Sequence, residues 1–265
     1  MQLHALLKSL DFYAKDFFNH ITIIYKTSNR LHSKTYKQLI SNYTNILFLK
    51  ENFLASFKKL LTKSLQYSSE YIVFMTDDDL LFSPLTANDK QAILTLMHQQ
   101  SLVTFSLRLG LNCTYSHPAN LHFQLKNYAV IQSDYLLWNW KEQDKGDFNY
   151  PLSIDGHIFK MLDFMEWIQD FNGQSPNHLE AYIQKENSVV SKMMGAYTHS
   201  KLVGIPINLV SDFSSNYYGK KYCYNQDDLA KKYLNGYIID FLSMDFSNIN
   251  SAHQELELKF KKYKE

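Results

Sequence analysis

The first hundred residues of the chain alternate between two hydrophobic patterns. Between 3 and 18, apolar residues such as Leu3, Leu6 and Leu10 recur at helical spacing, which predicts an amphipathic helix with one buried face. In contrast, the segment 20–29 is a β-branched run closed by turn-forming residues, the pattern of a buried strand. The same patterns predict further helices at 33–42, with Ser33 as N-cap, and at 53–65, and further strands at 45–52 and 71–76.

This order of strands and helices predicts the fold class. Strand, helix, strand, helix and strand at this spacing form βαβ units, in which parallel strands make a sheet covered by helices. We therefore predict an α/β fold of the Rossmann type, with a mixed, mainly parallel sheet flanked by helices. Such an arrangement is typical of a nucleotide-binding half-domain.

The pattern after residue 87 is less regular. It predicts a helix at 88–99, a strand at 102–110, a polar loop or hairpin at 111–127 and a strand at 128–132. The next segments predict a helix or turn at 133–140, helices at 157–171 and 178–194, a last strand at 201–210 and mainly helix beyond 225.

Length and composition exclude several classes of protein. The 265 residues are enough for one large domain with a full core. A formal net charge of +1 gives no global field that would attract nucleic acid, so a local site has to hold any anionic ligand. The two cysteines, Cys113 and Cys223, are too few for a disulfide framework and are typical of a reducing compartment.

The sequence also predicts a cytoplasmic location. Charged residues interrupt the N-terminal segment, which therefore does not resemble a signal peptide, and no stretch approaches the ~20 apolar residues of a spanning helix. The C-terminal lysines leave two alternatives open, an ordinary solvated helix face or a peripheral contact with the inner face of a membrane. These residues are Lys259, Lys261, Lys262 and Lys264.

Arginine is rare in this chain. Of the 27 basic residues only Arg30 and Arg108 are arginines, so lysine is the default cation. An arginine kept in such a background suggests a need for a planar, bidentate donor to phosphate or carboxylate, although two chance arginines are the alternative. Arg108 lies within an apolar strand, where a charge is costly unless it is paired, and an aspartate of the triplet or donor oxygens are the expected partners. The alternative is that Arg108 emerges at the solvent face of the strand.

Three consecutive carboxylates follow the most apolar predicted strand. Asp77, Asp78 and Asp79 come directly after YIVFMT at 71–76, where the carboxyl end of a strand meets the ligand crevice of an open α/β sheet. Three adjacent carboxylates repel one another unless a cation neutralises them, and their oxygens suit Mn²⁺ or Mg²⁺ shared with substrate phosphates. The alternative is that the aspartates only form a turn.

With this triplet, the sequence resembles the GT-A glycosyltransferases over roughly residues 20–215. The resemblance rests on the DxD motif, Asp77-x-Asp79 in VFMTDDDLLF, behind a buried strand with βαβ units upstream. It implies a GT-A-like catalytic domain at 1–224, with a nucleotide-binding half at about 1–110 and an acceptor half at about 111–224, and a helical C-terminal extension at 225–265. It also implies that Asp79 is the main metal ligand, Asp77 the second, and Asp78 a ribose or sugar contact.

The same resemblance implies further site residues. The nucleotide would contact the loops after the first two strands, through Thr27, Ser28, Asn29, Arg30 and Glu51, although a helix-entry turn and a surface glutamate are the plain alternatives. A late histidine, His199 or His253, would be a third metal ligand.

Candidates for acid–base chemistry follow in the second half. Asp155 at a turn into a helix is either the catalytic base of an inverting transfer or a helix cap. His157 would assist catalysis or bind the acceptor, or serve the core. Glu180 stands three residues after Asn177, which favours a capping pair over a basic or acceptor-binding role. Aromatic residues that would stack on a sugar are Tyr115, Trp138, Trp140 and Tyr150.

These features together predict sugar transfer from a nucleotide-sugar donor, with a UDP-sugar favoured, to a saccharide or lipid-linked acceptor. A sugar-phosphate nucleotidyltransferase is an alternative, but the loop TSNR at 27–30 lacks the glycines such enzymes use. A non-catalytic carbohydrate-binding protein on a degenerate transferase fold is the other alternative. The sequence does not predict the oligomeric state.

Overall fold

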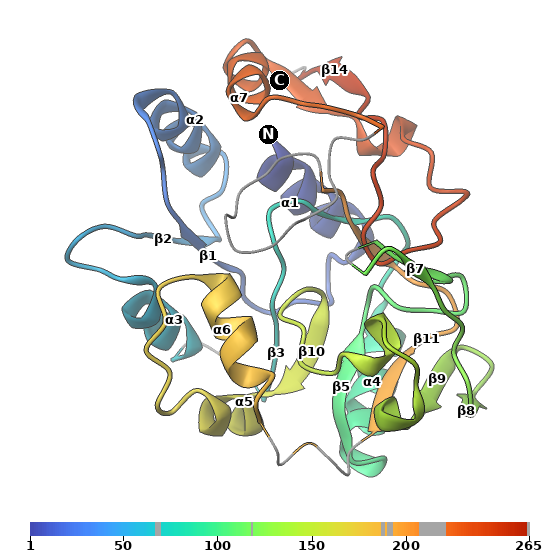
Figure 1. Cartoon of the computed structure of the whole chain (residues 1–265). Coiled ribbons are helices and arrows are strands. Elements are labelled where there is room, and N and C mark those ends of the chain that lie inside the picture. Colours follow the sequence, from blue (N-terminus) through green and yellow to red (C-terminus); the bar gives the residue numbers. More distant parts are fainter. Residues whose placement is uncertain (67–69, 118, 187–188, 190–192, 207–220, 264–265) are drawn as a thin grey trace.

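A six-stranded sheet forms the centre of the computed structural model, which describes residues 1–66, 70–117, 119–186, 189, 193–206 and 221–263 (Figure 1). The strand order is β3-β10-β5-β11-β9-β8. These strands span Tyr71–Val73 (β3), His157–Lys160 (β10), Leu102–Ser106 (β5), Met193–Tyr197 (β11), Tyr135–Trp138 (β9) and Tyr128–Ile131 (β8). A separate parallel pair joins β1 (Thr22–Tyr25) to β2 (Leu47–Lys50).

The α/β class and a mixed sheet flanked by helices are confirmed, but the strand pairing differs from the expected one. β11 pairs with β5 in parallel, whereas β10 runs antiparallel to both β3 and β5, and β9 runs antiparallel to β11 and β8. The parallel βαβ pattern therefore holds for β1 and β2 and not for most of the central sheet. Periodicity locates strands but carries no information about which strand inserts between two others.

Alternating side chains divide the core into two layers, one on each face of the central sheet. In β9, Leu136 and Trp138 pack in one layer while Tyr135 and Leu137 pack in the other. The first layer is covered by α3 (Phe57–Leu65), α5 (Met161–Trp167) and α6 (Pro176–Ile183). The second is covered by α1 (Gln2–Tyr13) and α4 (Ala87–Gln99), with one buried leucine of α2 (Arg30–Ser41).

Most elements of the first hundred residues occur as predicted, with shifted ends. The helices α1, α2, α3 and α4 and the strands β1, β2, β3 and β5 all match predicted segments. The start of α2 is a correction, because Asn29 and not Ser33 caps it by accepting a hydrogen bond from the backbone N–H of His32. The polar segment 111–127 contains a short hairpin of β6 (Tyr115–Ser116) and β7 (Leu121–His122), one of the two predicted alternatives.

Two predicted helices in the second half are strands instead. The segment 133–140 contains β9, and the segment predicted as a helix at 157–171 begins with β10 before α5 starts at Met161. Both short apolar runs are buried on two faces, and such runs have no period that separates strand from helix. The helix predicted at 178–194 is shorter, since α6 ends at Ile183, β11 begins at Met193, and 187–188 and 190–192 lie outside the described residues.

The C-terminal segment is not the helical extension that we predicted. After α7 (Gln226–Leu234) the chain forms β13 (Tyr237–Ile239), a 3₁₀ turn η3 (Phe241–Ser243) and β14 (Phe260–Lys262). Apolar residues of this segment pack against β4 (Asp79–Leu81), β12 (Leu202–Gly204) and α1 in a third core cluster, whose contacts outweigh helix propensity. Of the strand predicted at 201–210, the described residues 201–206 contain β12, while 207–210 lie outside the described residues, and β12 is not the last strand.

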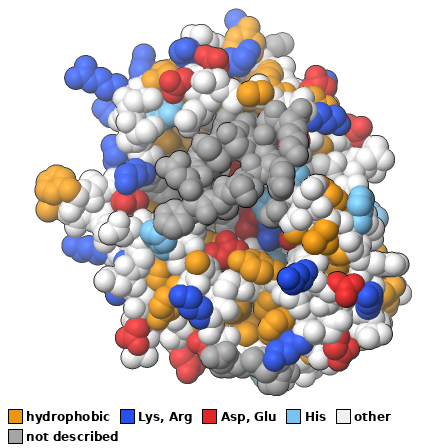
Figure 2. All heavy atoms as spheres, viewed as in Figure 1, with side chains coloured by type: hydrophobic (Ala, Val, Ile, Leu, Met, Phe, Trp, Pro, Cys, Tyr) orange, Lys and Arg blue, Asp and Glu red, His pale blue; other side chains and the backbone are white. Residues whose placement is uncertain are grey.

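The C-terminal lysines lie on or beside β14 and not on a helix face. Lys259 pairs with Glu257 at 2.6 Å and Lys261 pairs with Asp240 at 2.7 Å, while Lys264 lies outside the described residues. In the part of the chain that the structure describes, no helix has both the length and the apolar character needed to cross a membrane. Lys and Arg side chains are interspersed with Asp and Glu over the face shown in Figure 2.

Candidate active site

The acidic triplet lies in a tight turn between β3 and β4. The backbone N–H of Asp79 donates to the carbonyl of Thr76 at 3.2 Å, and the backbone N–H of Thr76 donates to Asp79 Oδ2 at 2.9 Å. Asp77 and Asp78 occupy the two central positions of this turn. Asp79 Oδ2 and the side chain of Asp78 both bond to Thr76 in this turn, whereas the buried Asp79 Oδ1 has no hydrogen-bond partner among the described residues.

A glycine opposite the triplet makes room for His253. Gly204 is the register partner of Asp79 in the antiparallel β4–β12 pair, and its backbone also bonds to the C-terminal segment, by its N–H to Ala252 and its carbonyl to Gln254. A Cβ atom on Gly204 would lie 2.6 Å from the His253 ring and 3.5 Å from Asp79 Oδ1. The structure thus brings His253, and not the exposed His199, to the triplet.

Four side chains from distant parts of the sequence meet at this point, and we call Asp79, Arg108, Asp155 and His253 the Arg108 cluster. Arg108 Nη1 donates to Asp155 Oδ2 at 2.6 Å, and His253 Nε2 lies 2.8 Å from the same oxygen. Arg108 and Asp155 are both buried, with 4% and 7% of their surface exposed. The predicted pairing of Arg108 with an aspartate holds, but its partner is Asp155 and not the triplet.

Asp155 does not lie at the start of a helix, contrary to the sequence prediction. It precedes Gly156, whose φ of +69° suits glycine, and β10 follows directly. The carbonyl of Gly156 accepts a bond from Leu107, and its N–H donates to Phe74, so this turn joins β3 to the end of β5. Asp155 is therefore fixed by backbone pairing beside the acidic triplet, and helix capping does not explain it.

The carboxyl groups of the cluster have strongly different pKa values. Burial and the neighbouring charge of Asp155 raise the pKa of Asp79 well above its usual range, while burial and Asp77 raise the pKa of Asp78 to about 6. Burial alone would also raise the pKa of Asp155, but Arg108 and His253 outweigh it and hold that pKa well below its usual range. Asp155 is thus an anion over the whole physiological pH range. Its negative charge opposes the ionisation of Asp79, so Asp79 ionises only when additional positive charge is nearby.

The composition of the site fits a divalent cation. Burial would lower the pKa of Arg108, but the nearby carboxyl groups of Asp155, Asp147, Glu180 and Asp79 outweigh burial and raise it. The unpartnered Asp79 Oδ1 is a hard oxygen donor of the kind that Mn²⁺ and Mg²⁺ prefer. Among the residues that the structure describes, no three His, Cys, Asp or Glu side chains are arranged so that they could hold a metal ion together. One or two protein carboxylates with substrate phosphates are the usual coordination of Mg²⁺.

Glu180 faces the same site from α6, and the capping prediction for it is wrong. Ser175 is the N-cap of α6, so Glu180 lies too far into the helix to complete a capping box with Asn177. Its carboxylate instead accepts hydrogen bonds from Ser153 and Tyr150, and burial raises its pKa. Ser153 also accepts a bond from Arg108 Nη2 at 2.8 Å, which links Glu180 to the Arg108 cluster.

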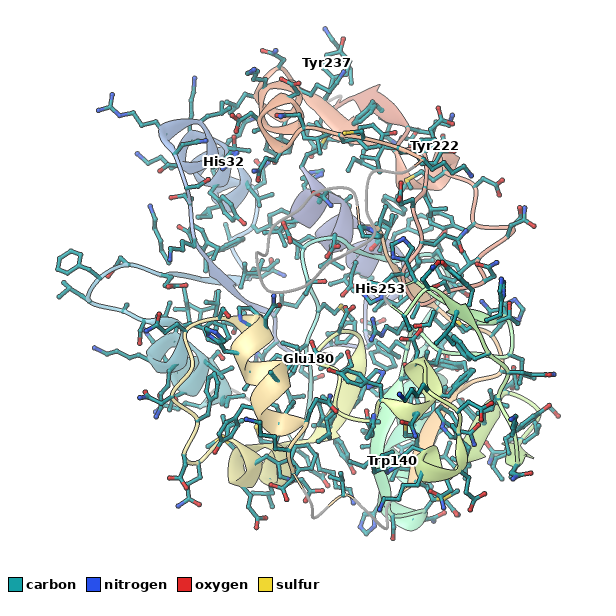
Figure 3. All side chains as sticks on the ribbon, viewed as in Figure 1. His32, Trp140, Glu180, Tyr222, Tyr237 and His253 are labelled. Carbon is teal, nitrogen blue, oxygen red and sulfur yellow. The ribbon has the colours of Figure 1, made fainter. Side chains whose placement is uncertain are left out.

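Figure 3 shows where Glu180 and His253 lie relative to the rest of the molecule. Glu180 on α6 and His253 from the C-terminal segment flank the centre of the view, whereas Trp140 lies toward its lower edge. A small pocket borders the triplet. Its lining residues come from α1, the triplet, β12 and its continuation, and the C-terminal segment, and they are Gln2, Ala5, Asp77–Asp79, Leu80, Ile205, Ile239 and Leu258.

His157 is a core residue of β10. Its side chain is 1% exposed, its Nδ1 lies 3.3 Å from the carbonyl oxygen of Pro151, and its Nε2 has no partner among the described residues. Burial, followed by the charge of Arg108, lowers its pKa to about 3. His157 is therefore neutral at physiological pH and is part of the packed core beside Asp155.

His157 should make the fold sensitive to acid. Because its pKa is lowered on folding, the unfolded chain takes up a proton below pH 6.5 that the folded chain refuses until about pH 3. This difference removes about 3 kcal/mol of stability between pH 7 and pH 4. Urea unfolding of the wild type and of His157→Gln at both pH values should show the wild type losing its stability advantage by that amount. An advantage that does not change with pH would contradict this account.

The loops after β1 and β2 contact other parts of the protein. Besides capping α2, Asn29 donates to Asp227 of α7 at 3.3 Å, and Ser28 Oγ lies 2.8 Å from His32 Nδ1. Lys26 pairs with Glu51 at 3.4 Å. Thr27 is half-buried and Arg30 is exposed at the start of α2.

The aromatic candidates differ in their surroundings. Trp138 is fully buried and donates to the carbonyl of Phe148, so it belongs to the core and the stacking prediction is wrong for it. Trp140 donates to the carbonyl of Val189, and Tyr115 donates to Asn120. Tyr150 alone among the four donates to a carboxylate of the candidate site, Glu180.

Sequence reasoning missed Ser153, Tyr150 as a partner of Glu180, and Gly204. Ser153 lies two residues before Asp155 in the sequence, and this closeness is the one local signal that Ser153 belongs to the same site. Gly204 lies in an apolar run, where a lone glycine indicates a close approach of another chain segment. That signal was present in KLVGIPINLV, but it does not name His253 as the neighbour.

No protein-family model matches the chain, and no curated protein matches it. Among solved structures, it is similar to residues 1–349 of Staphylococcus aureus TarS, with 12% sequence identity and a TM-score of 0.43. The match covers 76% of this chain and spans 56% of that structure.

Proposed function

We propose that the protein is a metal-dependent glycosyltransferase, which moves a sugar from a nucleotide-sugar donor to a saccharide or lipid-linked acceptor. The proposal rests on one observation: Asp79 Oδ1, in the turn of the acidic triplet, is buried and has no hydrogen-bond partner among the described residues. A carboxylate oxygen buried in this way is stabilised by a proton or by a cation.

In this proposal Asp79 and a second group of the triplet, Asp77, would hold Mn²⁺ or Mg²⁺, and phosphates of the donor would complete the coordination. When bound, the ion supplies positive charge that offsets the charge of the leaving diphosphate. Arg108 and His253 would keep Asp155 anionic beside the ion. Asp78, the neighbour of Asp79 in the sequence, is proposed to contact the ribose or sugar of the donor. A UDP-sugar is the favoured donor.

We assign the role of base to Glu180 in preference to Asp155. The ion pair with Arg108 holds the pKa of Asp155 low, which makes it a poor proton acceptor, whereas burial raises the pKa of Glu180 and makes it a better one. Glu180 would take the proton of an acceptor hydroxyl as that oxygen bonds to the anomeric carbon. The bond to the diphosphate breaks on the opposite face with its electron pair, and the product has inverted configuration.

A nucleotide panel tests the proposal. Thermal unfolding would be followed with UDP, GDP and CMP, each with and without Mn²⁺. One nucleotide, with UDP favoured, should raise Tm by about 5–10 °C at a hundredfold excess over Kd, and only with the metal present. The absence of any metal-dependent shift would contradict the proposal. A shift combined with no transfer to any acceptor would favour a binding protein on a transferase fold.

A further inference from the structure

The loop between β2 and α3 carries two adjacent and strongly exposed apolar side chains. Phe53 is 95% exposed and Leu54 is 70% exposed. Figure 1 shows this loop projecting from the body of the molecule, and Figure 2 shows hydrophobic side chains standing out at the same edge of the view. Single exposed apolar residues are common, but two adjacent ones at the end of a projecting loop are not expected on a surface that contacts only solvent.

The backbone holds this tip in one shape. Asn52 and Ala55 form an isolated antiparallel bridge, and Asn52 Oδ1 accepts hydrogen bonds from the backbone N–H groups of Leu54 and Ala55 at 2.9 and 3.1 Å. Lys59 reaches back from α3 to the carbonyl oxygen of Leu54 at 3.4 Å. These bonds satisfy several backbone groups of the turn locally, while the side chains of Phe53 and Leu54 stay exposed to solvent.

Lysines surround the tip. Lys50 precedes it, and Lys58, Lys59 and Lys63 follow it on α3, with exposed or half-buried side chains. Glu51 is the one acidic residue between 47 and 63, and it pairs with Lys26. Unlike Lys259 and Lys261 near the C-terminus, which pair with carboxylates, these lysines give the surface around the tip a net positive charge.

We propose that this tip, Phe53 and Leu54 with the surrounding lysines, is a docking site for an anionic membrane surface. An apolar tip buried at the boundary between headgroups and acyl chains, with lysines at the level of the lipid phosphates, is the arrangement of a peripheral membrane anchor. The lysines around the tip favour an anionic lipid surface over a second copy of this chain, because the same surface of that copy would carry the same positive charge. The proposal is independent of the glycosyltransferase assignment.

Vesicle sedimentation tests it with the full chain. Vesicles of phosphatidylcholine with 30% phosphatidylglycerol should bind the wild type at least tenfold more tightly than pure phosphatidylcholine vesicles, at about 0.1 M salt. Phe53→Ser combined with Leu54→Ser should lower binding to the anionic vesicles at least tenfold. Lys58→Gln combined with Lys59→Gln should lower binding and reduce its dependence on salt.

The matched control is Leu162→Ser on α5. Leu162 is 83% exposed, like the tip, but Asp163 and Glu166 lie next to it on the same helix, so its loss should leave vesicle binding unchanged. A Phe53→Trp variant gives a second measurement, since its fluorescence should shift to the blue on anionic vesicles. The proposal is wrong if the wild type ignores anionic vesicles, if Leu162→Ser acts like the tip variants, or if those variants change only the oligomeric state.

Discussion

Replacing Glu180 by glutamine is expected to slow sugar transfer by ~10²–10⁴-fold while nucleotide binding and Tm stay close to those of the wild type. Glutamine keeps the shape of the side chain and still accepts the hydrogen bonds from Ser153 and Tyr150, but it cannot take a proton from an acceptor hydroxyl. Single-turnover rates measured with a saturating donor, together with the nucleotide-induced shift in Tm, would separate the loss of chemistry from a loss of binding.

The pH profile makes the test of Glu180 specific. A base must be ionised to act, so the rate should fall as pH drops through the pKa of Glu180, and burial places this fall at a higher pH than for an ordinary glutamate. This acidic limb should be absent from the residual activity of the variant. Glu166→Gln, an exposed glutamate on α5, is the control and should leave the rate unchanged.

Asp155→Asn decides between the two candidate bases, provided that folding is measured alongside activity. Removing this carboxylate leaves Arg108 buried without its partner, which costs about 3–5 kcal/mol. A low rate with a lowered Tm would therefore reflect the broken ion pair. Full activity of Glu180→Gln, with a stable but inactive Asp155→Asn, would return the role of base to Asp155.

The second large effect is expected for Asp79→Asn, which should abolish the metal-dependent Tm shift given by the nucleotide. The same substitution should leave the metal-free protein at least as stable as the wild type. The amide oxygen of the introduced asparagine can still accept the bond from Thr76, and the neutral amide replaces a carboxyl group whose ionisation is disfavoured beside Asp155 in the metal-free protein. Tm would be measured for both proteins with nucleotide alone, with Mn²⁺ alone and with both.

Asp16→Asn is a suitable control for Asp79→Asn, because it removes an exposed carboxylate elsewhere and should keep the full shift. A shift that survives Asp79→Asn would mean that the triplet is not where the metal and the diphosphate meet. A large loss of stability in the metal-free variant would mean that Asp79 serves the fold instead.

The sequence was most informative where a local pattern decides the structure. The run YIVFMT followed by three aspartates correctly placed a strand and a turn of carboxylates at its end, and the helical spacing of leucines correctly placed α1 and α3. An arginine within an apolar strand correctly predicted a buried ion pair. Each of these predictions depends on neighbours in the sequence and on the cost of burying charge.

The sequence was least informative where distant segments meet. His253 and Asp155 are 98 residues apart, and the contact between them depends on the backbone bonds of Gly204 to the C-terminal segment. The insertion of β10 between β3 and β5, which places Asp155 beside Asp79, likewise has no local signal. Glu180 looked like a cap because the spacing from Asn177 is right, and only the position of Ser175 in the structure rules this out.

The way in which His253 reaches the site has a consequence during synthesis. A ribosome makes Asp79, Arg108 and Asp155 first, and the histidine follows only 98 residues after the last of these. Until then the nascent protein exposes the backbone of Gly204, together with the apolar residues that later pack against the C-terminal segment. The growing chain therefore carries an exposed apolar surface and an incomplete Arg108 cluster until the C-terminal segment has been made.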